Sequence, residues 1–381
     1  MNKIAIRINA NKVINPNTSS TNNHIAKSIF LAGPITDWRE KAIKYLYDHG
    51  YDGTIFNPEV STQQYNNNYD NQFKWEHEHL DKADLIIFWI PRDISNGITG
   101  LATNIEFGLY AHSNKLVVGI PSREKEQYII NCCDENNIPL FYTLEETLNY
   151  ALEKLSSITT NIRTDIECNI PLFIWQNNEF QTWYQQQIKI GNKLLGFKCL
   201  YSFFMPKAKV LFLWICHVKM YIAAEDRIKD NEFILSRSNI SSVVMYYKNN
   251  IVLIKEYRSP CCNNECYVYE LPGGSEINNI NNIQIAIDEV KQETDIEINS
   301  NRLQLINCRQ AIATLSTHHI YAYKLELTKQ EFEKIKKQEN TLHGLHKDSE
   351  YTYLIIKSID EIITNSLVDW ANIGIILSAL K

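Results

Sequence analysis

A single acidic residue, Glu106, stands where a carboxylate could act as a nucleophile. It lies in GITGLATNIEFGLYA, where a loop containing glycine and threonine runs into an amphipathic segment. We expect a helix with Glu106 in its first turn, where the positive helix end favours the ionised carboxylate that a nucleophile needs. Compensation of the helix dipole by a first-turn acid is an equally good interpretation of this segment alone.

A second set of polar residues lies in GGSEINNINNIQIAIDEVKQETDI, residues 273 to 296. A glycine turn precedes Glu289, Gln292 and Glu293, whose i, i+3 and i+4 spacing places them on one face of a helix. Carboxylate and amide oxygens arranged in this way can hold Mg²⁺ or Mn²⁺. Because the amide carries no charge, we expect weaker cation binding than three carboxylates would give.

Short apolar runs alternate with amphipathic segments from residue 28 to 155, which predicts five strand–helix repeats. The predicted strands lie in SIFLAG, GTIFNP, ADLIIFWIP, KLVVGIP and IPLFY. Such alternation is typical of a parallel sheet covered by helices on both faces, and these sheets bind ligands beyond the carboxyl ends of their strands. Residues that directly follow the strands are therefore candidate site residues: Gly33, Pro34, Asn57 to Glu59, Pro91 and Arg92. A glycine at 33 would let the backbone approach a ligand closely.

The polar stretch 156–169 lacks periodicity and predicts a linker. Beyond it, strand-like runs surround one helix over 282–294, which favours a mixed α/β sandwich. We therefore expect an α/β protein. Residues 1–155 should form a doubly wound five-stranded parallel sheet of the Rossmann or flavodoxin-like kind. Residues 156–206 should form a linker and lead-in segment, and residues 207–381 an α/β/α sandwich with a mixed sheet.

Four stretches of the first domain resemble the nucleoside 2-deoxyribosyltransferase-like family in their order and spacing. They are IFLAGPITDWRE, IFNPE, WEHEHLDKADLIIFWIPR and GLATNIEFGLYAHSNKLVVGIP, and the resemblance covers about residues 28–155. It implies cleavage or exchange of the N-glycosidic bond of a (deoxy)nucleoside or its monophosphate. It also implies a homo-oligomer and no cofactor for this domain. The candidate substrate-binding residues are Gly33, Pro34, Asp37, Asn57 and Trp89.

The same resemblance assigns Glu106 as the nucleophile and Glu76 as a second catalytic carboxylate. Glu106 would attack the anomeric carbon, and Glu76 would position the sugar or handle the proton of the base, as in retaining glycosidases. Some transferases of the family carry an aspartate six residues before the nucleophile, where this sequence has Gly100. This difference favours hydrolysis over transfer to a second base. Trp89 could stack on a base or belong to the core, and Asp84, at the start of its strand, is expected to be structural.

The stretch YVYELPGGSEINNINNIQIAIDEVKQETDIEI resembles the Nudix hydrolase family, with the motif spacing preserved but several residues changed. Ile280, Asp288, Gln292 and Asp295 replace the Glu, Arg, Glu and Gly of the family motif. The resemblance covers about residues 207–381, and its flanking segments are similar to the ADP-ribose branch. It implies that a nucleoside diphosphate derivative is hydrolysed or bound. The implied site residues are Glu289, Gln292, Glu293 and Glu350 for Mg²⁺ or Mn²⁺, and Arg258 and Gly274 for substrate.

Composition excludes other function classes. The chain has 381 residues, a net charge of −6 and 44% apolar residues, which argues for a soluble globular protein and against nucleic acid as a partner. Apolar runs are too short to cross a membrane, since even residues 210–224 contain His217 and Lys219. The odd count of nine cysteines and the absence of a signal-like start favour the cytoplasm.

We therefore expect a two-domain enzyme of nucleotide metabolism that acts on a small-molecule nucleoside or nucleotide. An alternative remains open at this stage, because the altered motif would also suit a regulatory protein. In that protein the second domain would sense a nucleotide ligand without hydrolysing it.

Overall fold

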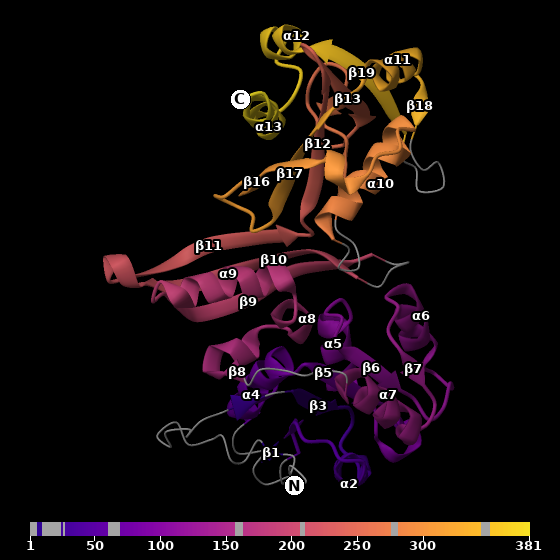
Figure 1. Cartoon of the computed structure of the whole chain (residues 1–381). Helices are drawn as coiled ribbons and strands as arrows, with labels where there is room; N and C mark the ends of the chain where they lie inside the picture. The colour runs from indigo at the N-terminus through magenta and orange to yellow at the C-terminus, as the bar shows by residue number, and fades with distance from the viewer. Residues whose placement is uncertain are drawn as a thin grey trace. The chain divides into compact units, whose positions relative to one another are not determined.

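A computed structural model describes residues 6–9, 24–25, 27–59, 69–156, 163–205, 210–275, 281–343 and 351–381. The chain divides into two compact units (Figure 1). The first contains residues Met1–Ser202 and Cys216–Glu232, and the second contains Phe203–Ile215 and Phe233–Lys381.

The first unit contains a six-stranded parallel sheet with the order β1-β4-β3-β5-β6-β7. Its strands are β1 (Ile6–Asn9), β3 (Ser28–Ala32), β4 (Thr54–Asn57), β5 (Leu85–Trp89), β6 (Leu116–Gly119) and β7 (Leu140–Phe141). The last five are the predicted strands, so the parallel sheet is confirmed. Strand β1 was not predicted, because it precedes the repeating pattern and joins the sheet at its edge. The order β4-β3-β5-β6-β7 is flavodoxin-like. The chain adds strands on one side of β3 first and then, from β5 onwards, on the other side, and such folds bind ligands at this reversal point between β3 and β5.

Helices cover both faces of this sheet, and every residue of β3 to β6 is therefore buried. The helices are α2 (Trp38–Asp48), α4 (Tyr69–Lys82), α5 (Leu101–Tyr110), α6 (Gln127–Glu135) and α7 (Leu144–Ser156). On one face, Phe30 and Phe88 share a core with Trp75 of α4, Phe107 of α5 and Ile129 of α6. Helix α7 contacts β5, β6 and α2, so α2 and α7 cover the opposite face of the sheet.

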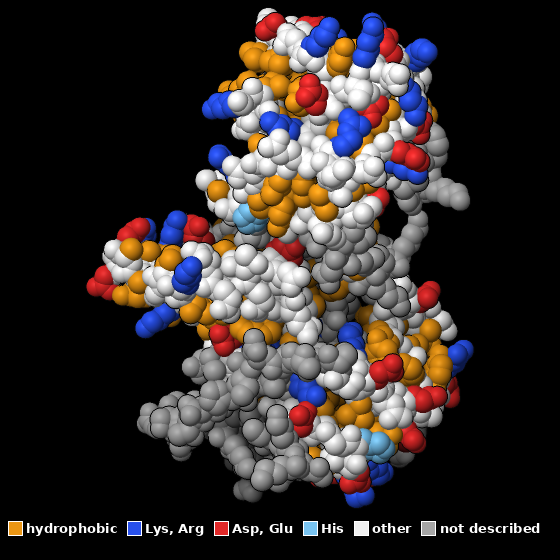
Figure 2. Space-filling model, in the orientation of Figure 1, with side chains coloured by type: hydrophobic (Ala, Val, Ile, Leu, Met, Phe, Trp, Pro, Cys, Tyr) orange, Lys and Arg blue, Asp and Glu red, His pale blue; other side chains and the backbone are white. Residues whose placement is uncertain are grey.

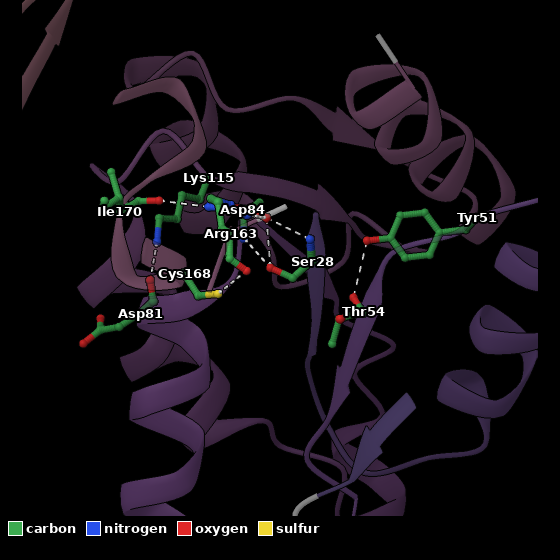
Figure 3. A network of polar contacts seen from close by, with 9 residues as sticks. All are labelled: Ser28, Tyr51, Thr54, Asp81, Asp84, Lys115, Arg163, Cys168 and Ile170. Atoms are coloured by element: carbon green, nitrogen blue, oxygen red, sulfur yellow. Dashed lines mark hydrogen bonds and ion pairs between the residues drawn. The ribbon is translucent and has the colours of Figure 1, made fainter. Parts of the chain in front are cut away.

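A buried polar network joins residues 163–170 to the amino ends of β3 and β5 (Figure 3). Arg163 is fully buried and forms an ion pair with Asp84 at 2.5 Å. The same Asp84 oxygen accepts hydrogen bonds from the backbone N and the Oγ of Ser28, at 2.8 and 3.0 Å. Asp84 thus has the structural position expected for it. Arg163, which follows the predicted domain end at residue 155, is thus buried against the first unit.

The chain then forms a separate three-stranded sheet with the order β11-β10-β9. The elements of this region are β2 (His24–Ile25), which pairs with β8 (Arg163–Thr164), α8 (Leu172–Trp175), α9 (Asn178–Lys189), β9 (Lys193–Phe204), β10 (Leu211–Ile222) and β11 (Arg227–Arg237). Short 3₁₀ turns cover Ile94–Asn96, Asp165–Asn169, Ala223–Glu225 and, in the second unit, Ser300–Arg302. Alternate residues from Trp214 to Met220 are buried on one face of β10, as their period of two predicts.

The second unit contains an eight-stranded mixed sheet with the order β16-β17-β12-β13-β19-β18, to which β14 and β15 add at β13 and β12. Strands β12 and β17 are parallel, and the other pairs are antiparallel. The strands are β12 (Ile240–Tyr247), β13 (Asn250–Tyr257), β14 (Tyr267–Glu270), β15 (Gly273–Ser275), β16 (Gln304–Gln310), β17 (His319–Glu326), β18 (Leu342–His343) and β19 (Thr352–Ser358).

Four helices accompany this mixed sheet: α10 (Asn282–Thr294), α11 (Lys329–Lys337), α12 (Ile359–Thr364) and α13 (Trp370–Ala379). Val290 of α10 packs in one core with Val243, whereas Ile376 of α13 packs in another with the adjacent strand residue Val244. Successive strand residues point to opposite faces, so the helices lie on both sides of the sheet. The expected mixed sheet is confirmed.

Charged side chains of both signs are interspersed on the face of the molecule that Figure 2 shows. Within the described ranges, none of the helices combines the length and the apolar character that a bilayer span requires.

Candidate active site

At the reversal point, the backbone after β3 lies very close to the end of β5, and the contact is at Gly33. This residue has a φ of +139°, and a Cβ placed on it would lie 2.1 Å from the carbonyl oxygen of Trp89. Only glycine therefore lets the end of β3 approach the end of β5 so closely. The glycine predicted to admit a sugar is required first by the packing of the protein itself.

Arg39 fixes the loop that follows β3. It is 2% exposed, and its guanidinium donates hydrogen bonds to the carbonyl oxygens of Leu31 at 3.1 Å, Pro34 at 3.2 Å and Gly33. The indole Nε1 of Trp38 donates to the same Pro34 oxygen at 3.1 Å. The first turn of α2 thus positions the loop at the carboxyl end of β3. Sequence reasoning did not identify Arg39, because a single arginine in an amphipathic helix gives no signal of burial.

Three carboxylates from different elements interact electrostatically with Arg39: Glu59 after β4, Glu76 of α4 and Glu106 of α5. Burial lowers the pKa of Arg39 to about 10, and these carboxylates oppose that shift. The structure thus brings Glu76 and Glu106, the two predicted catalytic residues, to the same place. It also adds Glu59, which the sequence marked only as part of a strand end.

The pKa of Glu106 is raised to about 7, mainly by burial and further by the charge of Glu76, while Arg39 opposes the increase. Burial also raises the pKa of Glu76, against a hydrogen bond of 2.7 Å from Gln72 Nε2 to Glu76 Oε1. Both carboxyl groups are therefore harder to ionise than usual, and mutual repulsion favours keeping one proton on the pair.

The expected place of Glu106 in the first helical turn is wrong. Helix α5 begins at Leu101 after Gly100, which caps it in a left-handed conformation with a φ of +62°, so Glu106 lies in the second turn. The field of the helix end falls off within the first turn. Burial and neighbouring charges, rather than the helix end, therefore set the protonation of Glu106.

Gly100 also keeps the start of α5 close to the loop after β3. A Cβ at this position would lie 3.1 Å from Pro34 Cγ and 3.6 Å from Arg92 Nη1. The aspartate that some transferases of the resembled family carry here would have to fit against both groups. The glycine is therefore consistent with the tight packing of this loop.

The remaining predicted residues of this unit have diverse environments. Asn57 is 1% exposed and its Oδ1 accepts a hydrogen bond from the Glu59 backbone at 3.2 Å, whereas its Nδ2 has no hydrogen-bond partner among the described atoms. The ring of Trp89 lies against Gly119, whose Cβ position is 2.5 Å from Trp89 Cε3, so this ring belongs to the packed core. Asp37 is exposed and pairs with Lys41 at 2.6 Å.

Comparison with protein families adds one result. Residues 26–123 match the family model described as nucleoside 2-deoxyribosyltransferase like. The matched range contains β3 to β6 and all of the site residues named above, from Gly33 to Glu106. A search of curated proteins finds no match to the chain. The family match supports nucleoside glycosyl transfer as the chemistry of the first unit.

In the second unit, helix α10 directs the predicted carboxylates at the glycines of β15. Glu289 covers Gly274 so closely that a Cβ there would lie 1.8 Å from Glu289 Oε1. Glu293 is 8% exposed and accepts a hydrogen bond from the Gly273 backbone at 3.2 Å. Burial raises the pKa of Glu293 well above its usual range, and Glu289 adds to this increase. Gln292 lies on the same helix and is half-buried.

Two further predicted residues of the second unit have different outcomes. Arg258 forms ion pairs with Glu256 at 2.9 Å and with Glu270 at 3.2 Å. Glu350 lies outside the described residues. Within the described residues, no group of three or more His, Cys, Asp or Glu side chains is arranged to hold a metal ion.

Proposed function

We propose that the first unit cleaves the N-glycosidic bond of a (deoxy)nucleoside or nucleotide through a covalent intermediate on Glu106. The observation that carries this proposal is the pairing of two half-buried carboxyl groups, Glu76 and Glu106, at the reversal point of a parallel sheet. Most glycosidases break the glycosidic bond with a pair of carboxyl groups whose pKa values are shifted by their surroundings.

The proposed reaction has two steps. The ionised Glu106 attacks the anomeric carbon, the carbon–nitrogen bond breaks, and its electron pair leaves with the base, which takes up a proton. A water molecule then attacks the same carbon, loses a proton and releases the Glu106 carboxylate. Water is preferred over a second base as acceptor, in line with Gly100 at the position where some transferases have an aspartate.

Glu76 is the proposed partner in proton transfer. Gln72 holds its carboxyl group through the hydrogen bond of 2.7 Å, and burial raises its pKa, which favours the protonated form. A protonated Glu76 supplies this proton to the departing base or holds a sugar hydroxyl. Arg39 holds the Gly33–Pro34 loop in place through its hydrogen bonds to the two carbonyl oxygens.

Chromatographic assay of free base tests this function. Nucleosides and nucleoside monophosphates are incubated with the intact protein, with Glu106→Ala and with Glu124→Gln, which removes a charge from an exposed side chain of the same unit. We expect metal-independent base release that is lost in Glu106→Ala and retained in Glu124→Gln. Equal base release by Glu106→Ala would exclude Glu106 as the nucleophile.

For the second unit we propose the binding or hydrolysis of a nucleoside diphosphate derivative such as ADP-ribose, as in a Nudix domain. Support comes from Glu289 and Glu293, which face the glycines of β15 from one side of α10. Glu256 and Glu270 also interact with the buried Glu293. A divalent cation beside Glu289 and Glu293 would stabilise their ionised forms, but the described residues contain no group of three or more His, Cys, Asp or Glu side chains arranged to hold one. Mg²⁺ or Mn²⁺ held by Glu289, Gln292 and Glu293 would neutralise the charge of a diphosphate.

The alternative for this unit is a regulatory site that binds its ligand without cleaving it. It is favoured by Gln292, whose uncharged amide weakens a cation site. Thermal unfolding with Mg²⁺ and ADP-ribose, together with an assay for AMP, separates the two functions. AMP formation that is lost in Glu293→Gln supports hydrolysis. Ligand-dependent stabilisation without AMP supports sensing, since a ligand that binds only the folded state raises the melting temperature. Absence of both AMP formation and ligand-dependent stabilisation would exclude both hydrolysis and sensing.

A further inference from the structure

The second unit contains a cavity of about 250 Å³ between α13 and the strands β16 and β17. Its lining includes Arg309 of β16, Ile320 and Ala322 of β17, and Trp370, Gly374 and Ser378 of α13. Helix α13 packs on the Val244 side of β12 and α10 on the Val243 side, so the mixed sheet separates this α13 cavity from α10 (Figure 1). The α13 cavity is therefore distinct from the site proposed at α10.

A β-bulge turns one arginine towards the α13 cavity. The pairing of β16 with β17 shifts register after Leu305, where Ile306 is an extra residue, and Arg309 then lies opposite Ile320. A ladder without the extra residue would place Arg309 opposite His319 instead, on the face of the sheet that α10 covers. The bulge thus redirects this side chain, which is a common use of bulges beside binding sites.

Arg309 supplies the charge of the α13 cavity. It is the one charged side chain among the described residues that line the cavity. It is exposed, and no ion pair or hydrogen bond joins its guanidinium to another described residue. The nearby cation Lys324 of β17 instead donates a hydrogen bond of 3.4 Å to the carbonyl oxygen of Ala379, in the last turn of α13. An anionic group in the cavity would therefore pair with Arg309.

Trp370, the first residue of α13, supplies an aromatic surface. Its side chain is 93% exposed, although an indole ring gains much from burial. The start of α13 is fixed, because Asn372 N donates to Asp369 Oδ1 at 2.8 Å and Asn372 Oδ1 accepts from Leu271 N at 3.2 Å. A fixed helix end therefore presents the ring at the mouth of the cavity, where a flat ligand can stack on it.

Gly374 leaves room beside this ring. Trp370, Gly374 and Ser378 are four residues apart in turn, so they lie on one face of α13. A Cβ at Gly374 would meet no described atom within 4 Å outside the adjacent helix backbone. Larger side chains are favoured over glycine in a helix interior, so a residue larger than glycine would fit α13 here and would fill the cavity.

We propose that the α13 cavity binds a small molecule that combines a flat aromatic ring with an anionic group. The ring stacks on Trp370 beside Gly374, and the anionic group pairs with Arg309. A mononucleotide and a simple aromatic carboxylate share this chemistry. The inference is independent of the functions proposed above, because it uses the opposite face of the sheet from α10 and none of the residues of the first unit.

Ligand-observed NMR titration of the full chain with cinnamate and with AMP tests this site. We expect cinnamate to bind with a dissociation constant of about 1 mM or tighter. Trp370→Ala should weaken binding by at least about fivefold through loss of stacking. Arg309→Gln should weaken it by roughly three- to tenfold, and by less at high salt because the exposed charge is screened. Gly374→Leu should abolish binding by filling the cavity.

Tyr128→Ala removes a ring that is 82% exposed in the first unit and should bind both compounds like the intact protein. AMP binding that responds to the α13 cavity variants would identify a mononucleotide as the source of the ligand, and a response of cinnamate alone would identify an aromatic acid.

Two results would overturn the proposal. They are undiminished binding in folded Trp370→Ala and Arg309→Gln, and no binding of either compound up to roughly ten times the expected dissociation constant. Uncharged cinnamamide that binds as tightly as cinnamate would overturn the pairing of the ligand with Arg309.

Discussion

Replacement of Glu106 by glutamine should stabilise the protein, and only at high pH. The pKa of this carboxyl group is raised from 4.5 to about 7 by burial and by Glu76. A carboxyl group with a raised pKa in the folded state binds its proton more tightly there than in the unfolded chain. Its favourable contribution is therefore complete below pH 4.5 and is lost as the pH rises through 7. Glutamine stays neutral throughout and does not undergo this loss.

The magnitude follows from the shift. The difference of about 2.5 pKa units between 7 and 4.5 corresponds to about 3.4 kcal/mol at 1.36 kcal/mol per unit. Glu106 is partly exposed, so solvent screening reduces this value, and we expect a difference of about 1–3 kcal/mol. For a unit of this size, each kcal/mol corresponds to roughly 2–4 °C in melting temperature.

Thermal unfolding of the intact chain between pH 5 and pH 8.5 measures this difference. Glu106→Gln should melt close to the unmodified protein at pH 5 and about 2–12 °C above it at pH 8.5. Glu124→Gln provides the control for loss of one exposed negative charge. A difference between Glu106→Gln and the unmodified protein that stays constant with pH, or that decreases as the pH rises, would refute the assigned environment of Glu106.

Other perturbations test the surroundings of the site. Gly33→Ala places a Cβ against the carbonyl oxygen of the neighbouring strand and should lower the free energy of unfolding by at least about 2 kcal/mol. Gly108→Ala has open space around its Cβ in α5 and should raise the free energy of unfolding by roughly 0.5–1 kcal/mol. Urea denaturation compares the two, and equal effects would contradict the close contact at Gly33. Arg163→Met leaves its carboxylate partner buried and should cost about 3–5 kcal/mol in the same assay; a loss below about 1 kcal/mol would show that this ion pair does not hold the segment. The value of kcat/KM for base release should rise with pH around a midpoint near 7 as Glu106 ionises, and a flat profile between pH 5 and 8 would exclude an ionised Glu106 as the nucleophile.

The sequence predicts the parallel sheet well because its signal is local and repeated. Each buried strand is an apolar run and each covering helix is amphipathic, so the alternation alone defines β3 to β7. Strand β1 lies outside this pattern, and its pairing with β4 is a long-range contact that no local signal reveals. The same limit applies to Arg163, which looks like an ordinary polar residue of a linker until tertiary packing buries it.

The electrostatics of the candidate site could not be predicted from the sequence. The family resemblance assigns Glu76 and Glu106 as catalytic residues, and this assignment stays a prediction. Their pKa values depend on burial between α4, α5 and the loop after β3, which is a property of the assembled fold. Asp295 gives a similar lesson in the second unit. It stands where the family motif has a glycine, yet it caps α10 in the left-handed conformation, and Lys334 donates a hydrogen bond to its carbonyl oxygen.

The two arginines of the candidate site are both occupied by the protein itself. Arg39 donates to carbonyl oxygens, and Arg92 is paired with Glu126. Burial, together with the charge of Glu76, raises the pKa of Glu106 to about 7, so the carboxyl pair retains a proton near neutral pH. The proposed cleavage of an N-glycosidic bond requires one carboxylate to attack and one carboxylic acid to supply a proton, and a carboxyl pair that keeps one proton meets this requirement.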